Sequence, residues 1–235
     1  MKVKVAIIPA RGGSKRILRK NIEAFCGKPI IAYSIEAATK SACFDQIIVS
    51  TDDRETVDVA MQYGDITTHS RSAKNADDHA TIADVILEVM ESLAKEEVYP
   101  DHLCCIFATA PFVTGEDLAL SYRLLLDHGF SGVFPVVEFS YPIQRSLKFD
   151  EKNNILMTWP EYLSSRSQDL PNRYHDAGQY YWVESKAFIE EKTLFVKNAT
   201  AIPISAMVSQ DIDTRDDWLI AEMKYQAFIE AKRAS

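Results

Sequence analysis

Val3-Lys4-Val5-Ala6-Ile7-Ile8-Pro9-Ala10-Arg11-Gly12-Gly13-Ser14 stands near the start of the chain and decides its fold class. The apolar run 3–9 predicts a buried β-strand, and the turn-forming residues 11–14 follow it directly. Ligands of open α/β sheets bind beyond the carboxyl ends of the strands. We therefore expect the loop after this strand to belong to a ligand site.

The rest of the chain alternates apolar runs with segments of helical periodicity. Further strands are predicted at residues 46–50, 103–107, 132–137 and 201–204. Helices are predicted at residues 29–39, 54–63, 81–95, 117–127 and 216–232. Strands that alternate with helices imply right-handed crossovers and a three-layer α/β fold around a mainly parallel sheet.

Residues 139–200 break this alternation, because they combine aromatic clusters and irregular polarity with Pro142, Pro160 and Pro171. We interpret this segment as an insertion over the active-site edge of the sheet and as a candidate dimer contact. With 235 residues, the chain is otherwise expected to form a single domain, residues 1–235.

The composition argues against several classes of protein. Hydrophobic residues make up 47% and charged residues 26% of the chain, as in ordinary globular proteins. The formal net charge is −8 without any basic tract, so neither a nucleic-acid partner nor a membrane surface is expected. The 4 cysteines lack a paired metal spacing, and Cys104 and Cys105 adjoin in an apolar run. This pattern indicates reduced thiols in a cytoplasmic protein.

Five cations lie between Arg11 and Lys20, directly after the first strand. Gly12 and Gly13 allow backbone N–H groups to approach phosphate oxygens, and the cations would neutralise a triphosphate. The loop matches neither the dinucleotide-binding nor the Walker pattern of glycines. A solvated basic loop is the alternative, but the position after a buried strand favours a phosphate site.

Asp211 and Asp213 are two residues apart, so on an extended segment both carboxylates point to the same side. Two hard oxygen donors on one side suit Mg²⁺, which takes few ligands from the protein. A helix cap at Asp213 is the competing interpretation, because Thr214 and a predicted helix follow it.

Residues 166–182 are rich in hydrogen-bonding and aromatic side chains, which suits a polyhydroxylated sugar that carries a carboxylate. An interface, or a loop packed on the sheet, explains the same composition equally well. The 5 histidines show no metal spacing, and only His175, inside this segment, is a functional candidate.

The sequence Ala10-Arg11-Gly12-Gly13-Ser14-Lys15, followed by Lys20-Asn21, resembles the signature of the CMP-sialic acid synthetase family. Four further motifs follow one another in the same order as in this family, so the resemblance spans nearly the whole chain. They are residues 48–52, Arg71, residues 109–111 and residues 211–214. It implies a Rossmann-like nucleotidyltransferase fold, usually dimeric. It also implies an enzyme that joins CTP to a nine-carbon acidic sugar, giving a CMP-sugar and pyrophosphate.

The resemblance further implies catalytic roles for Arg11, Lys20 and Asp211, and a Mg²⁺ site at Asp211 and Asp213. The expected CTP site includes the turn 78–81. Its expected ligands are Ala10, Arg11, Gly12, Gly13, Ser14, Lys20, Asn21, Arg71 and Thr81. Relatives usually have proline at the position of Leu18, and its loss is expected to make the loop less rigid.

Residues 140–147 and 166–182 together are most similar to the branch of the family that uses pseudaminic acid. In the neuraminate branch, a glutamine stands where this chain has Ala108. The expected sugar ligands are Ala108, Gln144, Arg145, Arg166, His175 and Tyr181. The resemblance also implies a homodimer in which Leu194 and Phe195 approach the partner's sugar site. The alternatives are a CMP synthetase for N-acetylneuraminic acid, legionaminic acid or Kdo, and a nucleotide-binding module without catalysis.

Overall fold

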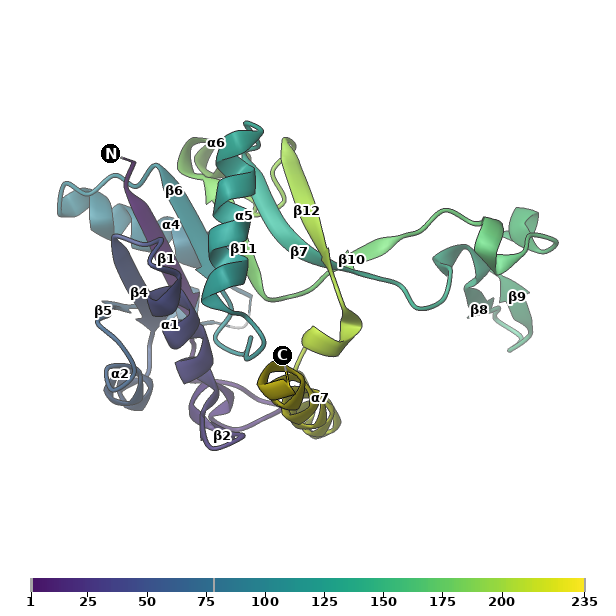
Figure 1. The fold of residues 1–235 in the computed structure, drawn as a ribbon, viewed down its shortest axis with the longest axis horizontal. Helices are drawn as coiled ribbons and strands as arrows, with labels where there is room; N and C mark the ends of the chain where they lie inside the picture. The colour runs from purple at the N-terminus through teal and green to yellow at the C-terminus, as the bar shows by residue number, and fades with distance from the viewer. Residues whose placement is uncertain (1, 78, 235) are drawn as a thin grey trace.

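The computed structural model describes residues 2–77 and 79–234, and Figure 1 shows a sheet with helices on both faces and an arm to one side. Asp78, the first residue of the expected turn 78–81, lies outside the described residues. None of the helices within the described ranges is long and apolar enough to cross a membrane.

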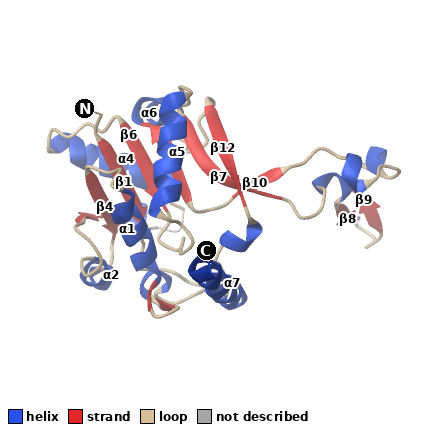
Figure 2. Ribbon diagram, in the orientation of Figure 1, coloured by secondary structure: helices blue, strands red, loops and turns tan. Residues whose placement is uncertain are grey.

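Eight strands form the main sheet, drawn in red in Figure 2. They are β1 (Lys4–Pro9), β4 (Gln46–Thr51), β5 (Thr67–Ser70), β6 (His102–Ile106), β7 (Gly132–Glu138), β10 (Tyr174–Asp176), β11 (Tyr180–Glu184) and β12 (Ala199–Ile204). Two small hairpins pair β2 (Ala24–Phe25) with β3 (Lys28–Pro29) and β8 (Leu147–Phe149) with β9 (Ile155–Met157).

Seven α-helices accompany the strands within the described ranges. They are α1 (Ile30–Ser41), α2 (Arg54–Ala60), α3 (Ala73–Ala76), α4 (Ile82–Lys95), α5 (Gly115–Asp127), α6 (Ser185–Glu191) and α7 (Arg215–Ala234). Five short 3-10 helices complete the secondary structure: η1 (Lys20–Ile22), η2 (Ile143–Arg145), η3 (Pro160–Tyr162), η4 (Ser167–Asp169) and η5 (Ala206–Val208).

The sheet is mixed and mostly parallel, which confirms the predicted fold class. Strand β1 lies between β4 and β6 and is parallel to both, and β5 continues the parallel part beyond β4. Strand β11 is antiparallel between β6 and β7, while β12 is parallel to β7. The parallel strands β1, β4 and β6 end at one edge, where the cation-rich loop follows β1.

Alternate residues of the strands face two separate cores, which makes the three layers (Figure 1). Ala6 and Ile8 of β1 pack in the core that α1 and α5 cover. Val5 and Ile7 face the opposite core, which α4 and α6 cover. The adjacent cysteines of β6 divide in the same way, with Cys104 in the first core and Cys105 in the second.

A third apolar cluster attaches the C-terminal helix to the loop after β1. Ile17 from that loop and Trp218 from α7 pack around Phe25, whose ring meets the ring of Trp218 edge-on at 5.5 Å. Ile212 belongs to the same cluster, so its flanking residues Asp211 and Asp213 are brought beside the cation-rich loop.

The structure differs from the expected insertion 139–200 in the second half of that segment. Strand β11 lies in the interior of the main sheet, and Trp182 on this strand has no exposed surface. A run of apolar residues buried on both faces of a sheet is a central strand, whatever surrounds it in the sequence. Only residues 140–172, here called the arm, leave the body; they hold β8, β9 and three 3-10 helices (Figures 1 and 2).

Candidate nucleotide site

A cavity of about 500 Å³ opens at the carboxyl ends of the parallel strands. Its walls come from the loop after β1, from the segment between β5 and α4, and from the residues that follow β6. The lining residues are Pro9, Arg11, Ser14, Lys15, Arg16, Lys20, Asn21, Arg71, Asn75, Asp77, Ala80, Ile82, Val85, Phe107, Ala108 and Thr109. The structure therefore brings Arg11, Ser14, Lys20, Asn21, Arg71 and Ala108, all singled out from the sequence, into one cavity.

Side chains from the loop itself hold its shape. The amide of Asn21 donates to the carbonyl oxygen of Arg11 at 2.9 Å, and Lys20 Nζ donates to the carbonyl oxygen of Ile212 at 2.6 Å. Ile17 is fully buried, whereas the neighbouring Leu18 is 74% exposed. The loop is thus fixed at several points along its length, on both sides of the exposed Leu18.

Gly12 has a structural role that the sequence did not predict. Its N–H donates to Asp52 Oδ1 at 2.9 Å, so this N–H does not face a ligand. A Cβ atom at Gly12 would lie 2.7 Å from the Cβ of Asp53, which explains the glycine by close packing. Ala10 is buried, and its N–H donates to the carbonyl oxygen of Ser50 at 2.9 Å. Of the two glycines, only Gly13 has open space where a Cβ would stand.

Arg71 follows β5 and is a nearly buried cation in the cavity wall, with 8% of its surface exposed. Its Nη2 donates to the carbonyl oxygen of Ser50 at 2.9 Å, while its buried Nε has no hydrogen-bond partner among the described residues. Burial lowers the pKa of Arg71, and the nearby Asp52 acts in the opposite direction. A buried guanidinium with an unused donor in a cavity wall is suited to an anionic or carbonyl oxygen of a ligand.

Thr81 does not line the cavity, contrary to its expected role as a CTP ligand. It is the N-cap of α4, where its hydroxyl accepts from the N–H of Asp84 and the Asp84 carboxylate accepts from the N–H of Thr81. The spacing Thr-x-x-Asp before an apolar helix is a capping-box pattern, so the sequence held the signal for this role. Asp77 and Ala80 of the same segment line the cavity instead.

Asp211 and Asp213 lie in the short segment before α7; neither lines the cavity, but Asp213 contacts two cations that do. Asp213 Oδ1 is 2.8 Å from Arg16 Nη2 and 3.6 Å from Lys20 Nζ, both from the cation-rich loop. The helix cap is Thr214, whose hydroxyl accepts from the N–H of Asp217 at 3.2 Å. The alternative of a cap at Asp213 is therefore not what the structure shows.

The two carboxylates fit a divalent metal ion. Burial, and then the charge of Asp213, raise the pKa of Asp211. The Asp211 carboxylate has no hydrogen bond or ion pair with any other described residue. Asp211 is exposed, and its charge and that of Asp213 repel each other, so a divalent cation between them would be favourable; Mg²⁺ accepts such a set of oxygen donors. Within residues 2–77 and 79–234, no third histidine, cysteine or carboxylate joins them, which matches the few protein ligands that Mg²⁺ takes.

Most of the expected sugar ligands do not reach this cavity within one chain. Gln144, Arg145 and Arg166 lie in the arm. Arg145 Nη1 donates to the carbonyl oxygen of Ser165 at 2.9 Å, and Arg166 Nε is 2.7 Å from Asp169 Oδ2. Gln144 is buried in the arm, and only Ala108 of the expected set lines the cavity.

His175 and Tyr181 lie on strands of the main sheet rather than in the cavity. His175 is exposed on β10, with its ring 5.0 Å from that of Phe139. Tyr181 is buried on β11, and its hydroxyl donates to the carboxylate of Asp176. Burial, and then this hydrogen bond, raise the pKa of Tyr181 well above its usual range. Tyr181 is therefore a core residue of its own chain.

Leu194 and Phe195 differ from each other in exposure. Leu194 is buried in the core that α4 and α6 cover, so it is not available to a second chain. Phe195 is 54% exposed, and its ring packs against those of Phe134 and Tyr181 at 5.1 and 5.6 Å.

Asn75 lines the cavity, but sequence reasoning did not identify it. Its side-chain N–H group donates to Glu88 Oε2 at 2.9 Å, which connects the cavity wall to α4. No pattern around Asn75 distinguishes it from an ordinary polar residue of a short helix.

A family model described as cytidylyltransferase matches residues 5–227. The chain is 40% identical over 222 residues to the pseudaminic acid cytidylyltransferase of Campylobacter jejuni, covering 94% of this chain and 96% of that protein. It is 31% identical to the CMP-N,N'-diacetyllegionaminic acid synthase of Legionella pneumophila, covering 93% and 94% of the two chains. A solved structure of CMP:2-keto-3-deoxy-manno-octonic acid synthetase complexed with CTP superposes with a TM-score of 0.67 at 18% identity, over 97% of this chain and 99% of that chain. This last likeness shows the shared fold alone.

Proposed function

Since the chain belongs to the cytidylyltransferase family, we propose that it transfers CMP from CTP to the anomeric 2-hydroxyl of pseudaminic acid, with release of pyrophosphate. We choose pseudaminic acid because the chain is similar to the Campylobacter jejuni enzyme over nearly the full length of both chains. We place the reaction in the cytoplasm, where CTP is made and where the four free cysteines would stay reduced.

The cavity supports the nucleotide half of this proposal. Its lining includes the cations Arg11, Arg16 and Lys20, which suit the triphosphate. The lining also combines apolar side chains, such as those of Ile82 and Val85, with Arg71, and this combination suits the base and ribose. The lining of this one cavity therefore offers groups suited to each part of a nucleotide: triphosphate, ribose and base.

In the proposed reaction, the sugar 2-hydroxyl loses its proton to solvent, and its oxygen bonds to the α-phosphorus of CTP as the bond to pyrophosphate breaks. Positioning and charge stabilisation carry such chemistry, so no covalent intermediate with the protein is required. Arg11 and Lys20 would stabilise the charge that develops on the phosphates. Asp211 and Asp213 would hold Mg²⁺, which when bound supplies Lewis-acid stabilisation of the phosphate oxygens.

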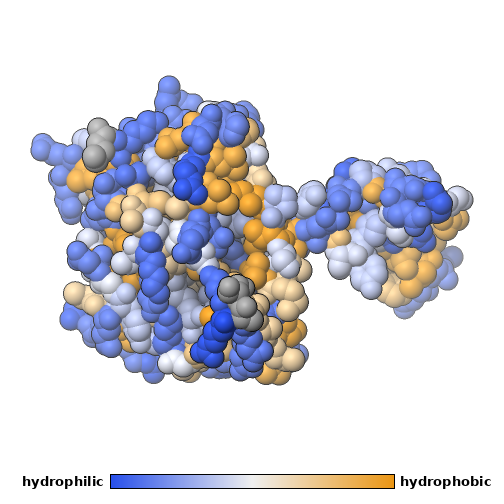
Figure 3. Space-filling view, viewed as in Figure 1, coloured by the Kyte–Doolittle hydropathy of each residue, from blue (hydrophilic) through white to orange (hydrophobic). Residues whose placement is uncertain are grey.

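We propose a homodimer to explain the arm. Its surface exposes several large apolar side chains, among them Tyr141 at 83% and Phe149 at 69%, and Figure 3 shows an apolar area on its lower side. Exposed apolar patches of this kind mark interaction surfaces. If the arm lies against a second copy of the chain, Arg145 and Arg166 would complete the partner's sugar site and bind the sugar carboxylate.

Pyrophosphate release with a panel of acidic sugars tests this function. The enzyme is incubated with CTP, Mg²⁺ and one sugar at a time. The sugars are pseudaminic acid, N,N'-diacetyllegionaminic acid, N-acetylneuraminic acid and Kdo. Rapid release is expected with pseudaminic acid and little with the other three. Release with another sugar alone would assign that sugar instead, whereas no release with any of them would contradict the catalytic proposal.

A further inference from the structure

The segment that carries both carboxylates, residues 208–213, is not a strand of the sheet. No ladder of backbone hydrogen bonds fixes it, and instead its carbonyl oxygens accept hydrogen bonds from side chains. Gln179 Nε2 donates to Val208 O at 2.6 Å, Lys224 Nζ to Ser209 O at 2.8 Å, and Lys20 Nζ to Ile212 O at 2.6 Å. The position of Asp211 and Asp213 thus depends on donors from three separate parts of the chain.

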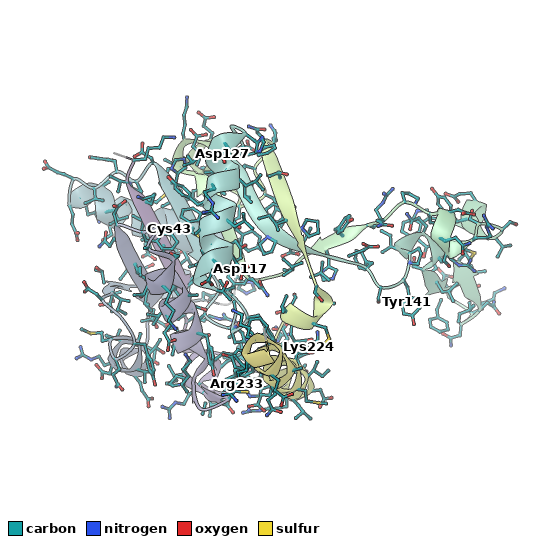
Figure 4. All side chains as sticks on the ribbon, in the orientation of Figure 1. Cys43, Asp117, Asp127, Tyr141, Lys224 and Arg233 are labelled. Atoms are coloured by element: carbon teal, nitrogen blue, oxygen red, sulfur yellow. The ribbon has the colours of Figure 1, made fainter. Side chains whose placement is uncertain are left out.

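Lys224 differs from the other two donors because it comes from the C-terminal helix. Figure 4 labels it on α7, beside the short helix η5 that leads into the segment. Its ammonium group also contacts Gln210 Oε1 at 3.0 Å, and no carboxylate lies within ion-pair distance among the described residues. Burial lowers the pKa of Lys224, so the charge is partly desolvated without an anion to compensate it.

The attachment of α7 does not explain this lysine. Rings of the third cluster already fasten the helix, with Tyr33 and Tyr225 at 5.0 Å and Phe25 and Trp218 at 5.5 Å. The hydrogen bonds of Lys224 instead end on Ser209 and Gln210, the two residues directly before Asp211.

We propose that Lys224 is a positioning residue for the metal site, an inference that rests on the proposed function. By holding Ser209 and Gln210, its ammonium group fixes the backbone directly before Asp211 and Asp213. Groups that orient metal ligands from outside the coordination sphere commonly change metal affinity about 10- to 100-fold when they are removed.

The test is Mn²⁺ binding to the full chain, measured from the electron paramagnetic resonance signal of free Mn²⁺. Lys224→Met keeps the length of the side chain and removes its donors. Lys232→Met is the matched control, because it removes the same charge from the same helix, where Lys232 lies over the ring of Phe228. Lys224→Arg keeps a donor and the charge, and thermal unfolding is followed for every variant.

We expect Lys224→Met to weaken Mn²⁺ binding about 10-fold, with Lys232→Met and Lys224→Arg close to the wild type. Turnover of Lys224→Met should recover when the Mg²⁺ concentration is raised, which a loss of fold would not allow. Wild-type affinity in Lys224→Met, or equal losses in the Met and Arg variants, would overturn the role of Lys224. A wild-type chain that binds no Mn²⁺ would overturn the proposed metal site as well.

Discussion

Arg71 is the residue whose surroundings most directly call for a ligand, because its Nε is a buried donor without a partner among the described residues. Arg71→Lys keeps the charge but removes the planar set of donors. We expect kcat/KM for CTP to fall about 10-fold or more, since a hydrogen bond from a charged donor is lost. Arg54→Lys on the surface of α2 is the matched control. Unchanged CTP kinetics in Arg71→Lys would remove Arg71 from the nucleotide site.

The second prediction for single residues concerns the role of Asp211 and Asp213 in turnover. Asp211→Asn and Asp213→Asn each remove an anionic oxygen donor, so turnover should fall on the order of 100-fold or more while the fold persists. EDTA should abolish wild-type activity, and added Mg²⁺ should restore it.

Asp216→Asn controls for these variants, because Asp216 is an exposed carboxylate in the first turn of α7. The measurements are pyrophosphate release and the midpoint of thermal unfolding. Full activity in either Asp211→Asn or Asp213→Asn would show that the carboxylates do not serve catalysis.

The capping box of α4 gives a prediction at the scale of an element. Thr81→Ala removes the acceptor for the N–H of Asp84 and should cost about 1 kcal/mol of the free energy of unfolding. Thr81→Ser keeps the hydroxyl and should stay close to the wild type. The KM for CTP should change in neither variant, because Thr81 does not line the cavity. A raised KM with unaltered stability would restore Thr81 to the list of CTP ligands.

The elements that the sequence predicts well are those whose environment is set locally. Strand β1 and helix α4 combine a clear period with clear boundaries, and the structure has them within one or two residues of the prediction. Strand β11 was missed because its run of aromatic residues resembles a sugar-binding surface as much as a buried strand. Only its pairing with β6 and β7, which are distant in sequence, shows that this run is a buried strand and not a sugar-binding surface.

The same limit applies to the candidate site. The cations of the loop after β1 and the pair Asp211 and Asp213 were accessible to sequence reasoning, because their spacing along the chain carries their chemistry. Asn75 and Lys224 were not, because each matters only through a partner that the fold supplies. The hydrogen bond from Gly12 to Asp52 spans 40 residues and has no local pattern either.

At the scale of the whole molecule, the arm is the feature that one chain leaves without a partner. We expect a dimer in solution at micromolar concentration, measured as a doubled mass by light scattering. Phe149→Asp places a charge on the exposed apolar surface of the arm and should shift the mass toward that of a monomer. Its turnover should fall through a higher KM for the sugar, because the partner's Arg145 and Arg166 would be lost.

Leu120→Asp is the control for this variant, since Leu120 is an exposed apolar residue of α5, outside the arm. It should remain dimeric and active. A wild-type chain that is monomeric and fully active would contradict the dimer while leaving the nucleotide site intact.

The proposed choice of sugar depends partly on Ala108, which lines the cavity. The alanine side chain offers no hydrogen bond to a sugar hydroxyl, and pseudaminic acid has fewer hydroxyls than N-acetylneuraminic acid. An apolar site rejects an added hydroxyl only moderately, so the remaining contacts must contribute to the preference.

A competition in one vessel measures this preference most directly. Equal amounts of pseudaminic acid and N-acetylneuraminic acid are mixed with limiting CTP and Mg²⁺, and the two CMP-sugars are separated by mass. CMP-pseudaminic acid is expected as the dominant product. Equal or greater formation of CMP-N-acetylneuraminic acid would contradict the proposed preference for pseudaminic acid.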